Sequence, residues 1–569
     1  KGVVIPTLSS LEGEKTGVFV KFNTTQGEKR LMKVAISYVS VEEAQNNMKS
    51  ELPAWNFDEI VKESAQNWDA MLGRIDVEGG TAVQQQRFYT DLFHALQGRR
   101  IVSDVSGTYI DNTGAAPLKK QVKLDANGKP AFNMYNSDSF WGAQWSLNTL
   151  WHLVYPEITE EFINCMLQMY DDGGLVPRGP SGGNYTYVMT GAATTPFITS
   201  AYLKGIKGFD INKAYEGIRK DHFPGGMMSK AGYEHTTFKG GGIEEYMALG
   251  YVPFPLTPIK YGFHQDGAAQ TLEYAYQDYA LAQMAKVLNK KQDYDLFSAR
   301  ANNYKNLFNK DIGWMWSKNK KGEWNQPIDI LDYEKGWVEG NAAQYTWFVP
   351  HDVPGLINLM GGNDAFTTKL NESFTKARVH NFVSGKSENP VDQKLIRRVY
   401  LNYGNQPCMQ TPFLFNYAGK PWLTQYWTRQ LIDSVYAGIS PQKGYSGDED
   451  QGLMGSLAVL LKIGLFSTDG GTSAKPFYEM TSPLFDKITI QLNPKYYPGK
   501  KVTIQTKNNG PNNVYIQSTQ MNGKSFNMPW IMHDDLIKGG LLEINMGAAP
   551  NKNWGVETLN APVSTLQKK

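Results

Sequence analysis

The amino-acid sequence predicts an α+β multidomain protein in which a helical barrel is joined to β-rich segments at both ends. The residues before 42 are rich in β-branched and aromatic side chains, and those after 476 alternate with a period of two. Between 81 and 475, apolar residues recur every three or four positions, as in helices. Roughly twelve such segments suit a toroid of paired helices, an (α/α)6 barrel.

Residues 1–42 are interpreted as the end of an N-terminal β-sandwich. Strands are expected at 18–22 and 31–39, with a polar turn between them. Because two or three strands cannot bury a sheet face alone, we expect earlier strands of this sandwich to lie upstream of Lys1. Residues 43–80 are expected to be a helical linker, since apolar residues follow helical spacing from Phe57 to Leu72.

The barrel is expected at 81–475, with the functional site in the loops at one of its ends. The clearest helix is 271–288, whose apolar residues fall on one broad stripe. Other helices are expected at 88–99, 138–154, 160–170, 196–204, 293–308, 342–360, 363–375, 422–436 and 453–463. Residues 476–569 are expected to form a β-rich unit packed with the N-terminal strands, with strands at 487–492, 501–506 and 514–518.

Composition argues against several classes of function. The 57 basic and 55 acidic residues nearly cancel, so the chain lacks the basic excess of a nucleic-acid surface. No run approaches the ~18 apolar residues of a membrane span, and no signal peptide opens the chain. Two cysteines exclude a disulfide framework and a cysteine zinc site. Aromatic residues make up 12% of the chain, and with many Asn- and Gly-rich loops this is typical of sugar-binding enzymes, although an aromatic core accounts for most of them.

A glycine-bounded acidic loop, Gly447-Asp448-Glu449-Asp450-Gln451-Gly452, is the first candidate site. An apolar, helix-like run follows at once, and carboxylates suit the start of a helix. Asp448 and Asp450 would point the same way in extended backbone, because they are two residues apart. Such a pair suits acid/base or metal chemistry; the alternative is a solvated acidic turn.

Five stretches, in this order along the chain, carry a family resemblance. They are 271–279 (TLEYAYQDY), 338–352 (VEGNAAQYTWFVPHD), 404–407 (GNQP) with 417–422 (YAGKPW), the acidic loop, and 481–485 (TSPLF). Together they resemble glycoside hydrolase family 92, the calcium-dependent, inverting exo-α-mannosidases, over nearly the whole chain. The resemblance implies a β-sandwich on an (α/α)6 catalytic barrel, with the first part of the sandwich absent here. It also implies an α-linked oligosaccharide or glycan as substrate and an extracytoplasmic location: periplasmic, cell-surface or secreted.

The resemblance also implies the catalytic residues. Glu339 falls where the family's general acid lies, and its apolar neighbours such as Trp337 could raise its pKa. The alternative for Glu339 is an N-cap or a surface carboxylate. Asp448 and Asp450 match the family's base pair; we favour Asp450 as the base, with Asp448 in support and Glu449 facing away.

Calcium is the cofactor that the resemblance implies. Calcium binds oxygen ligands, including side-chain amides. Asn405 and Gln406 are the candidate ligands, with Asp450 nearby or bridged by water. Outside this context, Asn-Gln-Pro would normally be a turn.

The chain departs from the family pattern at three places. Trp141-Gly142-Ala143 replaces the usual Trp-Asp-Thr, whose Asp grips the terminal sugar, so that this grip is either lost or supplied elsewhere, with Asp138 and Gln144 as the candidates. Arg178 lacks the tryptophan that often follows it, and Tyr403-Gly404 replaces the His-Glu pair of members that cleave α-1,2 bonds. The predicted substrate-binding residues are Trp141, Asp138, Gln144, Arg178, Tyr403 and Gly404.

The resemblance therefore predicts an α-mannosidase that is not specific for α-1,2 bonds. Two alternatives to this function stay open. Gly142 motivates a hydrolase of another α-glycoside that uses the same machinery. A glycan-binding homologue without catalysis is the second alternative. Retention of Glu339, Asp448 and Asp450 argues against it, since an inactive homologue need not keep all three carboxylates.

Overall fold

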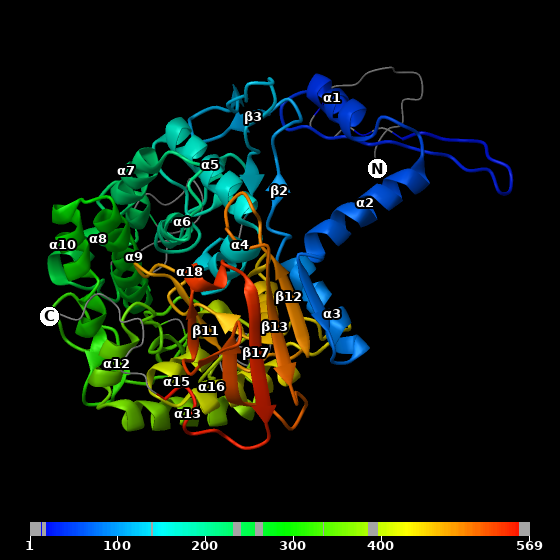
Figure 1. Cartoon of the computed structure of the whole chain (residues 1–569). Helices are drawn as coiled ribbons and strands as arrows, with labels where there is room; N and C mark the ends of the chain where they lie inside the picture. The colour runs from blue at the N-terminus through cyan, green and yellow to red at the C-terminus, as the bar shows by residue number, and fades with distance from the viewer. Residues whose placement is uncertain are drawn as a thin grey trace.

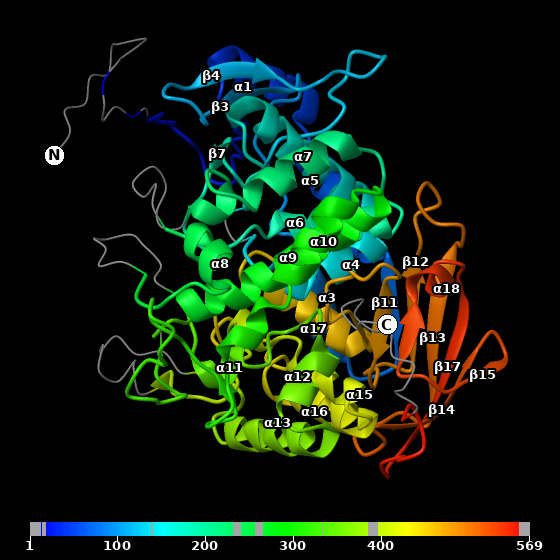
Figure 2. The same cartoon turned by 90° about the vertical axis from the view of Figure 1, so that its left-hand side faces the viewer.

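A computed structural model of the protein describes residues 13, 17, 19–137, 140–230, 240–256, 266–333, 335–384 and 396–556. It shows an α+β architecture in which a large helical body lies against a β-sheet built mainly from the C-terminal residues (Figure 1). In Figure 2 the sheet covers one side of the helical body, and α8 (Ile243–Leu249) and α11 (Ala342–Tyr345) lie on the opposite side.

The helical body contains inner helices that are almost fully buried and outer helices that are half-exposed. α17 (Leu453–Ile463) is buried at every position, as expected of a helix that is apolar on all sides. The inner helices also include α4 (Leu147–Val154), α6 (Thr194–Leu203), α9 (Gly267–Val287), α11 and α15 (Leu414–Tyr417). The outer helices are α3 (Ala82–His94), α5 (Pro156–Gly173), α7 (Ile211–Asp221), α10 (Lys291–Arg300), α12 (Val353–Leu359), α13 (Asn363–Arg378) and α16 (Pro421–Ser434).

The predicted helices are confirmed in position more often than in length. The helix expected at 271–288 is α9, and α3 packs against α17, so the first and last helices of the body are neighbours. The single helix expected at 342–360 is instead α11 and α12, separated by a turn. Pro350 cannot donate a helical hydrogen bond, and the side chain of Asp352 accepts one from Gly355 N at the start of α12.

The main sheet has six strands in the order β1-β12-β13-β17-β14-β15. Buried and exposed residues alternate along β13 (Lys501–Lys507), as expected of a sheet with one face against the body. β13 pairs with β17 (Gly540–Gly547) in parallel, and the other pairs are antiparallel. The remaining strands are β1 (Ile75–Glu78), β12 (Lys487–Gln491), β14 (Tyr515–Met521) and β15 (Lys524–Phe526).

Smaller sheets complete the fold. A three-stranded sheet has the order β10-β11-β16, from Leu465–Phe466, Phe477–Met480 and Trp530–Met532. Two-stranded ribbons are β2–β5 (Arg100–Ile101 with Tyr135–Asn136), β3–β4 (Thr108–Asp111 with Leu118–Gln121), β6–β7 (Pro180–Ser181 with Asn184–Tyr185) and β8–β9 (Phe308–Asn309 with Trp314–Met315).

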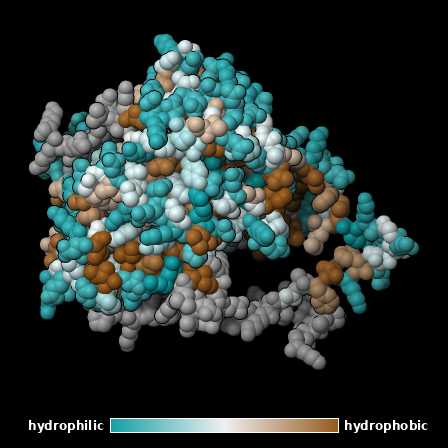
Figure 3. Space-filling model, turned by 90° about the horizontal axis from the view of Figure 1, so that it is seen from below, coloured by the Kyte–Doolittle hydropathy of each residue, from teal (hydrophilic) through white to brown (hydrophobic). Residues whose placement is uncertain are grey.

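The N-terminal expectations need two corrections. The strands expected at 18–22 and 31–39 are wrong for the described residues 19–39, which contain none; their apolar side chains lie exposed, Phe19 by 63% and Met32 by 84%. This arm extends away from the body (Figures 1 and 3), because two strands without further partners cannot bury a sheet face. The assignment of 1–42 to a sandwich stays a prediction.

The segment expected to be a helical linker contains a strand. After α1 (Val41–Glu51) and α2 (Phe57–Leu72), the chain forms β1, where Ile75 lies opposite Ile490 of β12. The early partner of the C-terminal sheet is therefore β1 and not the described residues 19–39. None of the described helices is both long and apolar enough to cross a membrane.

Candidate active site

Two glycine-containing loops meet at the predicted site. One leads into the short helix η4 (Gln406–Cys408), and the other is the acidic loop in front of α17. A Cβ on Gly447 would lie 1.8 Å from the carbonyl oxygen of Gly404, so only glycine permits this approach of the two backbones. Gly452, with φ of 111°, also lies against backbone, because its Cβ would be 2.9 Å from the carbonyl oxygen of Ala95. The glycines that bound the acidic loop therefore set its position.

Asp450 is held at the junction of these loops. The Gln406 side-chain amide donates a hydrogen bond to its Oδ2. Burial, followed by the negative charges of Glu339 and Asp448, raises the pKa of Asp450 to about 7. Like charges act strongly only over short distances, so Asp450 and Glu339 belong to one site.

Glu339 reaches the site from the chain before α11. Trp337 and Val338, just before it, are fully buried. The side chain of Asn405 donates to the carbonyl oxygen of Glu339 at 3.2 Å and to its Oε2 at 3.1 Å. The N-cap of α11 is Asn341, so the alternative of Glu339 as an N-cap is excluded.

The backbone is strained at both candidate carboxylates. Glu339 has φ of 47°, Asp450 of 56° and Gln451 of 54°. Residues with a Cβ occupy this left-handed region at a cost of roughly 1–2 kcal/mol each. Such strain persists where the surroundings enforce it, typically at functional sites.

The other two acidic side chains of the loop have different places. Glu449 turns away, as expected: its carboxylate accepts hydrogen bonds from the backbone N–H groups of Gly452 (2.7 Å) and Gly455 (2.9 Å) at the start of α17. The helix N-terminus stabilises this negative charge. Asp448 is exposed and contributes its charge next to Asp450.

The donor set at this junction fits calcium. The buried Oε1 of Gln406 has no hydrogen-bond partner among the described residues, although a buried amide oxygen normally has one. The Asp450 carboxylate lies beside it, and Asn405 is the preceding residue. The described residues contain no group of three or more His, Cys, Asp and Glu side chains arranged to hold a metal, so calcium here would need amide or carbonyl oxygens.

The predicted substrate-binding residues are only partly brought together. Gly404 lies in the loop junction. Tyr403 does not present its side chain there, because it is buried with its hydroxyl against Thr411. Arg178 is buried and donates to the carbonyl oxygens of Gly191 and Lys230, both at 2.8 Å.

The segment around Trp141 has no space for a carboxylate. A Cβ on Gly142, which has φ of 79°, would lie 1.8 Å from the ring of Trp145. Gln144 is buried, and its Oε1 has no partner among the described residues. Asp138 lies outside the described residues. The grip expected from Asp138 or Gln144 stays a prediction.

Glu273 on α9 is a site residue that the sequence analysis did not single out. Its Oε2 accepts hydrogen bonds from Trp141 Nε1 (3.1 Å) and Thr190 Oγ1 (2.9 Å), and burial raises its pKa to about 7. Burial has the largest effect on the pKa of Tyr345 and raises it, and the charges of Glu273 and Glu339 raise it as well. Because both carboxylates act on Tyr345, Glu273 lies near the site. The sequence signal was a carboxylate within the aromatic-rich 271–279 stretch, which also contains Asp278.

The chain matches the model of the glycosyl hydrolase family 92 catalytic domain over residues 43–548. A protein from Arthroderma benhamiae named "Uncharacterized secreted glycosidase" is 25% identical, over 97% of this chain and 65% of that protein. A family GH92 inverting mannosidase from Bacteroides thetaiotaomicron VPI-5482 superposes with a TM-score of 0.77 at 28% identity, over 93% of this chain and 68% of that one.

A second solved structure is also similar. It is a GH92 α-mannosidase from Bacteroides thetaiotaomicron in complex with mannoimidazole, with a TM-score of 0.77 and 28% identity. The alignment covers 91% of this chain and 63% of that one. The chain therefore spans about two thirds of the length of these relatives.

Proposed function

The chain belongs to glycosyl hydrolase family 92, and on that premise we propose that it is an inverting, exo-acting, calcium-dependent α-mannosidase-like hydrolase without specificity for α-1,2 bonds. One observation supports this most: Glu339, Asp450, Asn405 and Gln406, from three separate loops, form one hydrogen-bonded cluster. The two similar solved proteins, an inverting mannosidase and an α-mannosidase, agree with it.

In the proposed reaction, Glu339 protonates the glycosidic oxygen as the bond to the anomeric carbon breaks. Asp450 takes a proton from a water molecule, whose oxygen attacks that carbon from the opposite face, so the configuration inverts. A base with its pKa near the working pH suits this role, and burial moves the pKa of Asp450 in that direction. The Asn405 amide, bonded to Glu339, orients the acid.

Gln406, Asn405 and Asp450 would hold the calcium ion. When bound, calcium would contact hydroxyl groups of the sugar and favour a distorted ring. The Gln406 amide, which donates a hydrogen bond to Asp450, would also fix the position of the base.

The proposed linkage specificity comes from positions 403 and 404. Tyr403 is directed into the core, and Gly404 has no side chain. Neither position offers a polar side chain to the sugar next to the cleaved bond, in contrast to the His-Glu pair associated with α-1,2 cleavage.

Action on another α-glycoside is a second candidate function, favoured by one observation. The ring of Trp145 occupies the space that a side chain at position 142 would need. A sugar that does not depend on a carboxylate at this position would fit the same machinery.

We also infer that the alternating inner and outer helices form an (α/α)6 barrel. Several outer helices are followed along the chain by a buried one, as α3 is by α4, α5 by α6, α10 by α11 and α16 by α17, and contact of α3 with α17 closes the circle. We propose an extracytoplasmic location, in line with the secreted glycosidase named above.

Hydrolysis of a panel of α-linked mannosides and other α-glycosides, with and without a chelator, tests the proposal. NMR of the first-formed product should show the β-anomer from an α-mannoside. Retention of the α-configuration would refute the assigned roles of Glu339 and Asp450, and cleavage of only non-mannose α-glycosides would select the second candidate.

A further inference from the structure

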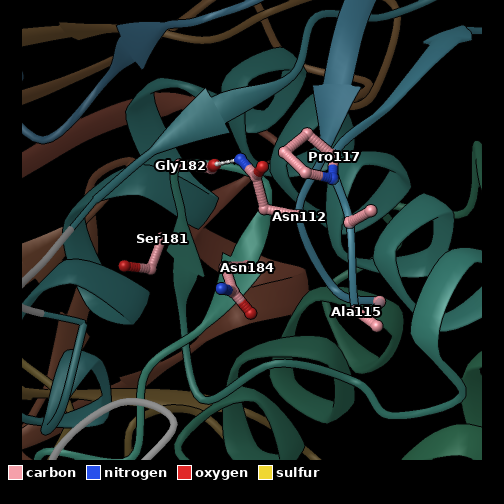
Figure 4. A pocket seen from close by; sticks show the side chains of 8 residues that line it. Asn112, Ala115, Pro117, Ser181, Gly182 and Asn184 are labelled. Carbon is pink, nitrogen blue, oxygen red and sulfur yellow. Dashed lines mark hydrogen bonds between the residues drawn. The ribbon is translucent and has the colours of Figure 1, made fainter. Parts of the chain in front are cut away.

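A polar pocket of about 620 Å³ lies between the tips of two hairpins outside the catalytic cluster (Figure 4). One wall is the turn of β3–β4, and the other is the turn of β6–β7. Its volume falls within the range of small-molecule sites in proteins. It is lined by Asn112, Gly114, Ala115, Ala116, Pro117, Ser181, Gly182 and Asn184.

The two hairpins are fixed to each other. Asn112 donates from its backbone N–H to the carbonyl oxygen of Gly183 (2.9 Å) and from its side chain to that of Gly182 (3.0 Å). Gly183 approaches the backbone of β3 so closely that a Cβ there would lie 2.3 Å from the carbonyl oxygen of Ile110. The pocket is therefore preformed, which reduces the entropic cost of binding.

An ion-pair network supports the β3–β4 wall from below. Lys120 of β4 lies 2.8 Å from a carboxylate oxygen of Asp111 and 2.9 Å from one of Asp172 on α5. Tyr109 of β3 donates to the other oxygen of Asp172 at 2.8 Å. These contacts pair the charges of Asp111 and Lys120 with each other and with α5, and neither residue lines the pocket.

The chemistry of the lining selects an uncharged, hydroxylated ligand. None of the described residues that line the pocket is charged. Figure 4 shows the side chains of Asn112, Ser181 and Asn184 around it, with Pro117 and Ala115 on another side. Amides and a hydroxyl match the hydroxyl groups of a sugar, while the small apolar residues match its C–H faces.

The pocket is connected to the catalytic loop. Ser137 N donates to the carbonyl oxygen of Pro180, at the start of β6, at 2.7 Å. Ser137 and Gln451 both pack around Gly98, whose Cβ would lie 3.3 Å from Ser137 Oγ and 2.8 Å from Gln451 O. Gln451 is adjacent to Asp450. In Figure 2, β3, β4 and β7 lie on the same side of the helical body as α8 and α11, away from the C-terminal sheet.

We propose that this pocket is a subsite for a neutral sugar unit of the glycan, remote from the bond that is cleaved. This rests on the proposed function, which supplies the glycan and the end that enters the catalytic cluster. The subsite would raise the affinity for long or branched oligosaccharides and leave short substrates unaffected.

The test fills the pocket with a larger side chain and measures kcat/KM on substrates of increasing length. Ala115→Trp places a large ring in the pocket, and Ala126→Trp, on an exposed turn that does not line it, is the matched control. With Ala115→Trp we expect kcat/KM to fall about tenfold on long mannose oligosaccharides, the effect of losing one or two hydrogen bonds. Activity on nitrophenyl α-mannoside should be unchanged, as should all activities of Ala126→Trp.

A binding measurement separates this proposal from the proposed function. Calorimetric titration of a mannose oligosaccharide into the Glu339→Gln protein should show binding that Asn184→Ala and Ala115→Trp weaken. If no α-glycoside is hydrolysed but binding depends on Ala115 in this way, the function is wrong and the subsite stands. If hydrolysis occurs and Ala115→Trp behaves as the parent at every length, or if no oligosaccharide binds, the subsite is refuted.

Discussion

The substitution Gly447→Ala should separate the two loops that build the catalytic cluster. Its Cβ would lie 1.8 Å from Gly404 O, while ordinary contact begins near 3.4 Å, so the loops must move apart by about 1.6 Å. That displacement would pull Asp450 away from Gln406 and Glu339. A misplacement of about 1 Å can cost ~10²-fold in rate, so we expect kcat to fall at least 10²-fold.

The assay is steady-state hydrolysis of an aryl α-mannoside, with circular dichroism to confirm folding. Gly444→Ala is the matched control in the same loop, because its nearest new contact is 3.3 Å from Ser440 O. Gly404→Ala should have an intermediate effect, since its closest contact, with a side-chain oxygen of Asn402, is 3.1 Å. A folded Gly447→Ala protein with a kcat within threefold of the parent would refute the claim that this backbone contact positions the base.

Three further predictions concern the acid, the metal and a buried carboxyl. Glu339→Gln should lower kcat on natural disaccharides by about 10²–10⁴-fold and largely spare kcat on aryl glycosides with good leaving groups. Asp450→Asn should instead lower kcat on both kinds of substrate together. Equal losses of kcat on both substrates for Glu339→Gln would place the acid elsewhere. Chelation should abolish turnover, and added calcium should restore it. The substitution Gln406→Ala should weaken calcium binding measured by calorimetry. Full activity after exhaustive chelation would refute the metal assignment. Burial raises the pKa of Glu479 from 4.5 to about 7, so the folded state keeps a proton that the unfolded chain loses above pH 4.5. The contribution of this protonated carboxyl to the stability of the folded state is therefore complete below pH 4.5 and is lost as the pH rises through 7. The free energy of unfolding of Glu479→Gln, relative to the parent and measured in urea, should therefore rise by ~3 kcal/mol between pH 4.5 and 8; parallel pH curves would contradict it.

Patterns that depend on neighbouring residues were predictable. The apolar stripe of 271–288 predicted α9, and the alternation at 501–506 predicted β13, because periodicity follows from the geometry of a single helix or strand. The same local pattern failed at 19–39. The strand-forming residues there do not pair into a sheet within the described part of the chain. β1, only four residues long, was missed because its pairing partner lies about four hundred residues away.

The sequence by itself determined the acidic loop with its glycines, the family motifs, and Asn405 and Gln406 as candidate metal ligands. Each of these is a property of a short contiguous stretch. Only the tertiary structure decided which side chains meet: Asn405 with Glu339, Gln406 with Asp450, and Trp141 with Glu273. It also directed Glu449 to the start of α17 and Tyr403 into the core. The physical reason is that a hydrogen bond or a pKa shift depends on distances in space, and these are set by how distant helices pack and not by separation along the chain.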